Sequence, residues 1–253
     1  MQCKNNVNRG VFLKNTGCGL CNRKCRVDRD NGEKGFCGET SEIRCGRAAL
    51  HMWEEPCISG TRGSGTVFFT GCVLKCVFCQ NSVLAESKVG KPVTVSRLAE
   101  IFLELQNKGA HNINLVTPTH FVPSIRESII LAKKNGLTLP IVYNTGSYES
   151  VDTIKSLEGL VDIYLPDLKY VSSELSKKYS KAPDYFETAK KAIDEMVRQT
   201  GTPEFDDDGI MKKGVIVRHL LLPGCLSDSK NVIKYLYDTY RDDIFISIMN
   251  QYT

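Results

Sequence analysis

The sequence predicts an α/β protein whose larger part, residues 63–253, is a partial (β/α)6 barrel preceded by a small cysteine-rich module, residues 1–62. Six short apolar runs are separated by segments with helical periodicity, which indicates parallel βαβ units. The runs do not alternate apolar with polar residues, as expected of strands that are covered by helices. Ten of the 11 cysteines lie within the first 79 residues, so the two parts differ in composition.

The predicted elements follow one another regularly from residue 66 onward. The first helix carries Val95, Leu98, Phe102 and Leu105 at helical spacing and is expected to end at Gly109. Further helices are predicted at 123–136, at 150–159 behind an N-capping serine, around 186–196 and at 227–242. The strands are predicted at 66–70, 113–117, 139–144, 161–166, 213–222 and 244–249. In such barrels the active site lies at the carboxyl ends of the strands.

Composition narrows the classes of function. The apolar fraction of 42% and the charged fraction of 25% are those of an ordinary globular protein. The net charge of +4 is mild and the basic residues are dispersed, so no nucleic-acid partner is expected. No apolar run approaches the roughly 20 residues that cross a bilayer, and the first residues lack the apolar region of a signal peptide. We therefore expect a cytoplasmic protein without a membrane partner, in which cysteines bind metal rather than form disulfides.

The stretch "TGCVLKCVFCQN", residues 70–81, directly follows the first predicted strand. Its three cysteines, Cys72, Cys76 and Cys79, lie where a (β/α) barrel keeps its chemistry. Thiolates are the usual ligands of iron–sulfur clusters, and three thiolates leave one corner of a four-iron cubane open for a ligand. The alternative is a zinc site that a distant residue completes.

This loop resembles the signature of the radical S-adenosylmethionine (radical-SAM) superfamily, in which an aromatic residue, here Phe78, precedes the last cysteine. More narrowly, the chain resembles the subgroup of pyruvate formate-lyase activating-enzyme-like (PflX-type) proteins. The stretches that carry this resemblance are "ISGTRGSGTVFFTGCVLKCVFCQN", "NTGSYE", "YLPDLKY", "RHLLLPG" and "MNQYT", and they are spread over most of the chain.

The resemblance implies a mechanism and its cofactors. A [4Fe–4S] cluster held by Cys72, Cys76 and Cys79 would bind S-adenosyl-L-methionine at its open iron, through the amino and carboxylate groups. One electron from the reduced cluster would cleave the sulfonium to a 5′-deoxyadenosyl radical, which abstracts hydrogen. The protein would orient these groups and exclude competing reactions. Phe78 is expected to pack on the adenine, because a flat apolar face suits a flat base.

The resemblance also implies further cofactor-binding residues. The superfamily often has a Gly-Gly-Glu segment at the end of the second strand, which holds the methionine amino group. This chain has "VTPTH" there, so Thr117, Thr119 and His120 take that place. The departure puts the amino contact in doubt, although backbone carbonyls could also make it.

Three more segments carry over from the activating enzymes. Asn144 and Thr145 match part of an Asp-Thr-Asn-Gly segment, and Asp167 and Lys169 match an Asp-Leu-Lys segment. In the family these contact the methionine carboxylate and, in some members, a monovalent cation; an asparagine at 144 weakens the cation prediction. Lys169 suits the carboxylate as a point charge. Arg218 matches an arginine that approaches the cofactor, and its fork of donors suits a carboxylate or a ribose.

A second cysteine set lies in the N-terminal module. Cys18, Cys21, Cys25 and Cys37 form a closed set of four ligands, which suits a metal site in a segment too small to fold on its own core. Tetrahedral zinc and a fully ligated [4Fe–4S] cluster are both compatible with the spacing. A similar segment accompanies the resembled subgroup. The nearby "HMWEEP", which holds Trp53, Glu54 and Glu55, is interpreted as an anchor at the domain junction.

The predicted function is therefore that of a radical-SAM oxidoreductase with an electron donor such as flavodoxin or ferredoxin. The resembled subgroup suggests a protein substrate, a glycyl-radical enzyme that loses hydrogen from a backbone glycine. The alternatives are a radical enzyme acting on another peptide or a small metabolite, and a non-catalytic iron–sulfur or zinc protein. The N-terminal module would relay electrons or shape the substrate entrance.

Overall fold

The structure is a computed structural model that describes residues 17–251. Cys3 and the last two residues of "MNQYT" lie outside the described residues. Its strands are β1 Arg44–His51, β2 Ser64–Phe69, β3 Lys91–Pro92, β4 Ile113–Val116, β5 Ile141–Thr145, β6 Ile163–Pro166, β7 Glu204–Phe205, β8 Met211–Leu220 and β9 Phe245–Met249.

The α-helices are α1 Pro56–Ser59, α2 Ser82–Ala85, α3 Val95–Asn107, α4 Val122–Lys134, α5 Val151–Lys155, α6 Ser173–Ser180, α7 Tyr185–Thr200 and α8 Leu226–Tyr240. Short 3-10 helices are η1 Arg29–Asn31, η2 Thr119–Phe121 and η3 Arg241–Asp243. The predicted N-cap of α5 is present, because the Ser150 side chain accepts a hydrogen bond from the Thr153 N–H. Between residues 17 and 251, no helix is both long and apolar enough to span a bilayer.

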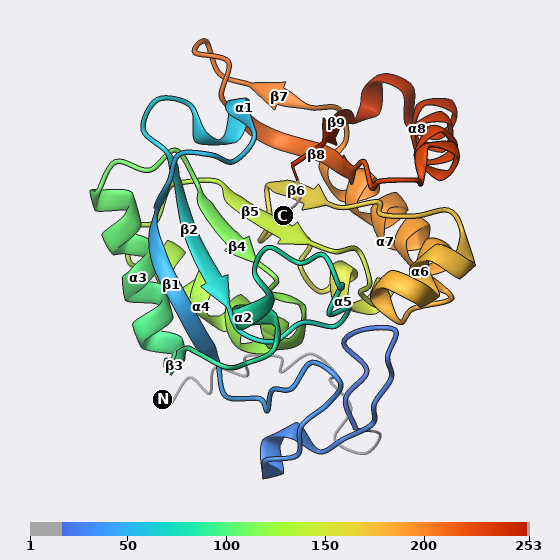
Figure 1. The fold of residues 1–253 in the computed structure, drawn as a ribbon. Helices are drawn as coiled ribbons and strands as arrows, with labels where there is room; N and C mark the ends of the chain where they lie inside the picture. The colour runs from blue at the N-terminus through green and yellow to red at the C-terminus, as the bar shows by residue number, and fades with distance from the viewer. Residues whose placement is uncertain (1–16, 252–253) are drawn as a thin grey trace, which may run out of the picture.

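The six predicted strands are β2, β4, β5, β6, β8 and β9, and they lie next to one another in that order. Each neighbouring pair is parallel. The pairing of β6 with β8 is the shortest of these parallel pairings: it consists of two residue pairs and one isolated bridge between Asp167 and Arg218. The structure confirms a mixed α/β fold built on a parallel sheet, and Figure 1 shows the strands fanning out in chain order.

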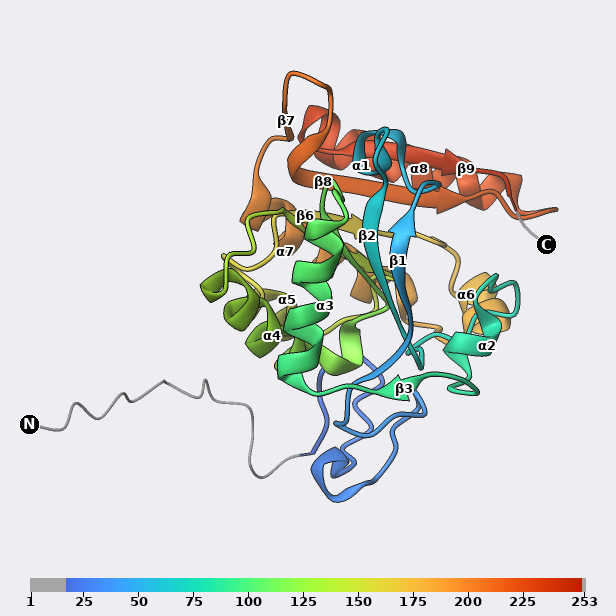
Figure 2. The ribbon, with the colours of Figure 1, turned by 90° about the vertical axis from the view of Figure 1, so that its left-hand side faces the viewer.

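Helices cover the outer side of this sheet. α3 and α4 pack side by side, and α7 packs against β6 and β8 (Figures 1 and 2). As predicted, α3 buries Leu98, Phe102 and Leu105, which are at most 2% exposed. The apolar core therefore lies between the helices and the strands, which leaves the carboxyl ends of the strands to polar chemistry.

Strand β1 is not among the predicted strands. It pairs antiparallel with β2 and, at its start, with the short β3, so residues 44–51 of the N-terminal segment join the main sheet. The reason lies in its burial: β1 is half-buried at the side of the sheet and has no fully buried residue. A strand in this position needs no apolar run, so its sequence, "RCGRAALH", does not stand out.

The cysteine-rich segment, residues 17–43, lies across the end of the sheet to which β2 points (Figures 1 and 2). It has little regular structure and is joined to the rest of the fold by hydrogen bonds. The Asn22 N–H donates to the Tyr148 carbonyl at 3.1 Å, and the Cys72 N–H donates to the Cys37 carbonyl at 3.3 Å. Arg23 donates from Nε to the Val73 carbonyl at 2.8 Å.

Gly71 makes the close approach between this segment and the three-cysteine loop possible. Its φ of +79° lies in the left-handed region that favours glycine. A Cβ at this position would lie 2.6 Å from Glu39 Cγ and 2.9 Å from the Cys37 carbonyl oxygen. A side chain here would therefore push the cysteine-rich segment away from the loop.

We expect Gly71→Ala to destabilise the protein more than Gly209→Ala, measured as the free energy of unfolding in urea. Gly209 has a similar φ of +73° but no atom within 4 Å of an added Cβ. Its substitution should cost only the left-handed strain, about 1–2 kcal/mol. The clash at Gly71 should add about 1–3 kcal/mol more. Equal costs for the two variants would contradict this account of the loop.

Candidate active site

A cavity of about 470 Å³ opens at the carboxyl ends of the parallel strands. This volume lies within the range of pockets that bind cofactors and small ligands. The cavity is lined by most of the residues that the sequence singled out: Cys72, Cys76, Phe78, Cys79, Thr117, Thr119, Asn144, Thr145, Asp167, Lys169 and Arg218. Residues spread over about 150 positions of the chain therefore meet at one site, while His120 is absent from the lining.

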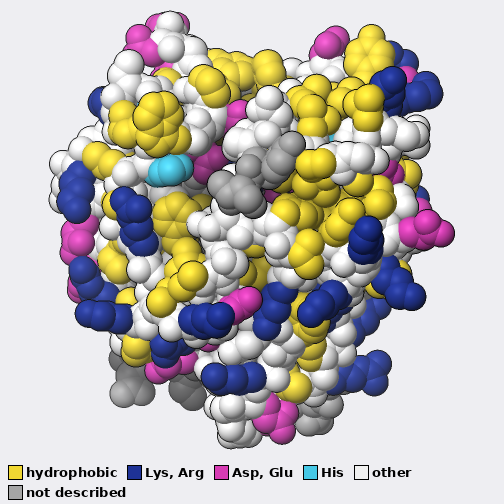
Figure 3. All heavy atoms as spheres, viewed as in Figure 1, with side chains coloured by type: hydrophobic (Ala, Val, Ile, Leu, Met, Phe, Trp, Pro, Cys, Tyr) yellow, Lys and Arg dark blue, Asp and Glu magenta, His cyan; other side chains and the backbone are white. Residues whose placement is uncertain are grey.

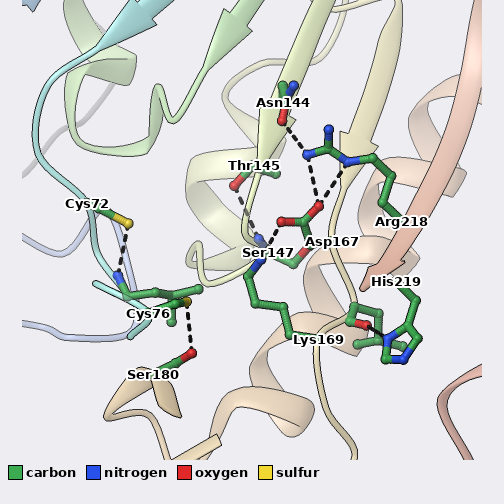
Figure 4. Close-up of polar contacts among 12 residues, drawn as sticks. Cys72, Cys76, Asn144, Thr145, Ser147, Asp167, Lys169, Ser180, Arg218 and His219 are labelled. Atoms are coloured by element: carbon green, nitrogen blue, oxygen red, sulfur yellow. Dashed lines mark hydrogen bonds and ion pairs between the residues drawn. The ribbon is translucent and has the colours of Figure 1, made fainter. Parts of the chain in front are cut away.

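The three-cysteine loop forms one side of the cavity and is half-buried. The Cys76 thiol lies 2.9 Å from the Ser180 hydroxyl, and Cys72 Sγ accepts from the Leu74 N–H at 3.4 Å (Figure 4). Burial raises the pKa of Cys76 to about 11, and the neighbouring thiols add to the rise while Lys169 opposes it. Burial likewise raises the pKa of Cys79. As thiolates, the three side chains would need a bound cation to compensate their charge.

The donor set fits an iron–sulfur cluster. The three cysteines line the same cavity and influence one another electrostatically. Among the described residues, no three cysteine, histidine or acidic side chains are gathered as a single metal ion would require. A cubane cluster asks for a different arrangement, because each thiolate binds a separate iron. Three thiolates on one loop therefore fit such a cluster, with one iron left open.

Phe78 stands beside the cysteines on the cavity wall. Its ring meets Tyr170 and Tyr179 edge-on, with centroid distances of 6.5 and 6.4 Å. Edge-to-face contacts of this kind fix the orientation of the ring. The half-buried Phe78 therefore has a fixed ring from which part of its surface can contact a ligand.

Arg218 lies at the centre of a buried polar network opposite the cysteines (Figure 4). From β8 it donates to Asp167 at 2.9 Å, to Asn144 at 2.7 Å and to Glu54 at 3.0 Å. Asp167 follows β6 and also binds the Lys169 ammonium. The side chains of Arg218, Asp167 and Lys169 are 14–16% exposed. The predicted residues of three strands thus form one charge-balanced cluster on the cavity wall.

Glu54 belongs to this network, although the sequence analysis interpreted it as part of a junction anchor. It reaches in from the loop between β1 and α1, and its second oxygen accepts from Asn114 at 2.9 Å and from Asn144 at 3.0 Å. Two cations and two carboxylates are thereby paired in the cluster. The only signal in the sequence was an acidic pair beside the lone tryptophan, because the partners of Glu54 are 60 to 164 residues away.

Charge pairing sets the protonation of these groups. Burial alone would raise the pKa of Asp167, but Arg218 and Lys169 hold it below its ordinary value. Burial alone would lower the pKa of Lys169, yet Asp167 and neighbouring groups raise it overall. The carboxylate and both cations are therefore ionised at neutral pH, ready to bind charged groups of a ligand.

His120 lies behind the cysteine loop. Its Nε2 is 2.6 Å from the Thr70 carbonyl, and the side chain is 2% exposed. Burial lowers the pKa of His120 to about 3, so the ring is neutral at neutral pH. Contact with a cofactor stays a prediction; the observed position favours a role in holding the loop.

Thr117 lines the cavity with a φ of +58°, the kind of strained backbone that clusters at functional sites.

The four N-terminal cysteines lie near one another at the back of the loop. Cys21 and Cys37 are buried, and burial raises the pKa of Cys21 to about 12; the charges of Cys18, Cys25 and Cys37 add to this rise. Cys37 is joined to Cys72 of the loop by a backbone hydrogen bond. The second cysteine set therefore adjoins the first.

Comparisons relate this chain to known proteins. Residues 66–221 match the family model described as the Radical SAM superfamily. Uncharacterized protein MJ0674 of Methanocaldococcus jannaschii is 30% identical over 244 residues, which are 93% of this chain and 65% of the relative. The fold is similar to the radical S-adenosylmethionine methyltransferase TsrM from Kitasatospora setae, solved with cobalamin and a [4Fe–4S] cluster. That similarity has a TM-score of 0.50 at 14% identity and covers 75% of this chain and 37% of TsrM.

We expect Arg218→Gln to lower the free energy of unfolding in urea by about 3–5 kcal/mol at pH 7, because two buried carboxylates lose their guanidinium. Asp167 has a depressed pKa in the folded protein, so its pairing stabilises the protein above the ordinary aspartate pKa and the benefit is lost as pH falls through the folded value. In the variant Asp167 keeps only Lys169 as a cationic partner, so its protonation costs less and the difference from wild type should shrink as pH falls toward about 4.

Arg97→Gln is the matched control for that measurement. The Arg97 guanidinium also binds two carboxylates, Glu100 and Glu104, but all three side chains are largely exposed. This substitution should change stability little. Similar losses for the two arginine variants would contradict the importance of the buried network.

Proposed function

Because the chain belongs to the radical SAM superfamily, we propose that it is an enzyme that reductively cleaves S-adenosyl-L-methionine and uses the product radical to abstract hydrogen. The observation that carries this proposal is the composition of one cavity. The three-cysteine loop faces ionised and amide side chains from three strand ends within it. Cluster ligands and groups for an amino-acid moiety are thus available at the same site.

Each part of the cavity has a role in the proposed reaction. Cys72, Cys76 and Cys79 would hold a [4Fe–4S] cluster, which supplies one electron to the sulfonium of S-adenosyl-L-methionine when bound. Lys169 and Arg218 provide cationic donors suited to the methionine carboxylate. The fixed ring of Phe78 offers an apolar surface for adenine.

The nature of the substrate is a finer proposal. Trp53 lines the cavity and is 88% exposed, and Val77, in the cysteine loop, is 69% exposed. Exposed large apolar groups beside a cavity are typical of docking surfaces, and tryptophan is frequent among binding hot spots. This favours a peptide or protein substrate. Hydrogen abstraction from a glycine of a glycyl-radical enzyme rests on the PflX-type motifs; a small metabolite is the alternative.

We propose that the N-terminal cysteines hold a second metal site that serves electron relay. The four thiols influence one another electrostatically, and Cys37 is hydrogen-bonded to the backbone of Cys72. A metal there would stabilise a segment that contains little regular structure. A [4Fe–4S] cluster could pass electrons to the loop, whereas zinc would only support the fold.

The proposed electron donor is a small acidic redox protein such as flavodoxin or ferredoxin. Figure 3 shows Lys and Arg side chains gathered over the lower part of the face that carries the cysteine-rich segment. Arg23 and Lys75 both lie over the Phe36 ring, at 3.9 and 5.4 Å, and Arg23 also binds the Lys181 carbonyl. A basic surface next to the cysteines would steer an acidic partner to it.

The proposed function predicts 5′-deoxyadenosine formation. The protein is reconstituted anaerobically with iron and sulfide, and dithionite and S-adenosyl-L-methionine are added. Wild type should form the product, and Cys76→Ala should not, because the cluster would lose one of three ligands. Absence of product, together with zinc rather than iron at the loop, would contradict the enzyme assignment and favour a non-catalytic metal protein.

Metal analysis of cysteine variants tests the second site. A variant in which Cys72, Cys76 and Cys79 are all alanine should still contain metal, and alanine at the four N-terminal positions should remove that remainder. About four irons would indicate a cluster and about one zinc a structural ion. Cys45→Ala and Cys57→Ala serve as controls that should lose no metal. A metal-free triple variant would exclude the second site.

A further inference from the structure

Glu149 is a buried carboxylate directly behind the cavity wall. It follows β5 in the "NTGSYE" stretch and is 1% exposed. One oxygen, Oε1, accepts hydrogen bonds from two hydroxyls, that of Thr119 at 2.6 Å and that of Thr145. Both threonines line the cavity, whereas Glu149 does not. Glu149 therefore acts on the cavity only through these two side chains.

The hydrogen-bond inventory fixes what the two hydroxyls can offer a ligand. A threonine hydroxyl has one proton and two lone pairs. Thr119 and Thr145 both give their proton to Glu149. Thr145 Oγ1 also accepts the Ser147 N–H at 3.2 Å, which leaves it one lone pair. Toward the cavity, both hydroxyls can therefore act only as acceptors.

This arrangement does not depend on the charge of Glu149. Its other oxygen, Oε2, makes no hydrogen bond of good geometry among the described residues, and the Tyr143 hydroxyl lies close enough to interact with both Glu149 and Thr119. Protonation of Oε2 would leave Oε1 an acceptor, so the two threonine hydroxyls keep the same orientation in either charge state.

The cavity lining also supplies the opposite kind of group. Lys169 and Arg218 carry only hydrogen-bond donors, and the lining carboxylates Asp167 and Glu54 are already paired with these two cations. An α-amino acid moiety needs donors for its carboxylate and acceptors for its amino group. The cavity thus contains both kinds, with the cations after β6 and on β8 and the threonine acceptors after β4 and at the end of β5.

We propose that Glu149 is a positioning residue that presents Thr119 and Thr145 as acceptors for the amino group of the bound amino-acid moiety. The inference rests on the proposed function, because it takes S-adenosyl-L-methionine as the ligand. It assigns the amino contact in this chain to two threonines that a buried acid holds in place, where the sequence has no Gly-Gly-Glu segment.

The experiment compares two ligands by equilibrium binding to the anaerobically reconstituted protein. S-adenosyl-L-methionine carries the amino group, and 5′-methylthioadenosine lacks the amino-acid moiety altogether. Glu149→Leu removes the acceptor, so the threonine protons are released and affinity for S-adenosyl-L-methionine should fall at least ~10-fold. Glu149→Gln keeps an amide oxygen as acceptor and should restore binding. Affinity for 5′-methylthioadenosine should stay unchanged in both variants.

Two further substitutions control for general damage. Glu195→Gln changes another buried carboxylate, one that binds Arg198 and Gln199 far from the cavity, and should affect neither ligand. Thr119→Val removes one hydroxyl while the Glu149 side chain stays in place. It should weaken the binding of S-adenosyl-L-methionine but not that of 5′-methylthioadenosine, while Thr119→Ser should bind S-adenosyl-L-methionine normally. These two variants carry the test if Glu149→Leu does not fold.

Several results would overturn the proposal. Wild-type affinity for S-adenosyl-L-methionine in Glu149→Leu or in Thr119→Val would remove the threonine acceptors from recognition. An equal loss of affinity for both ligands would show that Glu149 has a merely structural role. A loss of affinity in Glu149→Gln as large as in Glu149→Leu would assign the effect to the charge of Glu149. Wild-type protein that binds 5′-methylthioadenosine but not S-adenosyl-L-methionine would overturn the proposed function as well.

Discussion

The burial of one guanidinium determines how this site is built. Arg218 can lie inside the protein only because Asp167, Glu54 and Asn144 receive its donors. Those partners come from the end of β6, from the loop after β1 and from β5, so the pairing ties distant parts of the chain to one point. It also reinforces the shortest of the parallel strand pairings, where β6 and β8 share only two residue pairs and an isolated bridge. The site and the sheet thus stabilise each other.

A second constraint comes from behind the cavity wall. The cysteine-rich segment contacts both sides of the site: Cys37 binds the backbone of Cys72, and Cys21 forms an isolated β-bridge with Glu149. Gly71 allows the first of these contacts. The segment that would hold a second metal is therefore attached to the cysteine loop and to the acid that orients two threonines, so order in the segment and order in the cavity are linked.

The features that could be predicted from the sequence are those that leave a pattern within a short stretch of residues. Apolar runs revealed the six parallel strands, and spacing revealed the cysteine loop; both patterns are short. Strand β1 was missed because a half-buried strand at the side of a sheet carries no apolar run. Glu54 and Glu149 were missed as functional residues because an acid has no local signature of the hydroxyls, amides and guanidinium it will meet. His120 shows the opposite kind of error. Its place after a strand predicted a position in the cavity, but the side chain points toward the Thr70 carbonyl.

In this cavity, three cysteines would leave one position of a cluster open to a ligand. Electron paramagnetic resonance of the reduced, reconstituted protein detects such an open position, with spectra recorded before and after addition of S-adenosyl-L-methionine. We expect the ligand to change the spectrum of a [4Fe–4S] cluster, and the change to be absent when Cys72, Cys76 and Cys79 are replaced by alanine. An unchanged spectrum at saturating ligand would show that no position of the cluster is open to this ligand.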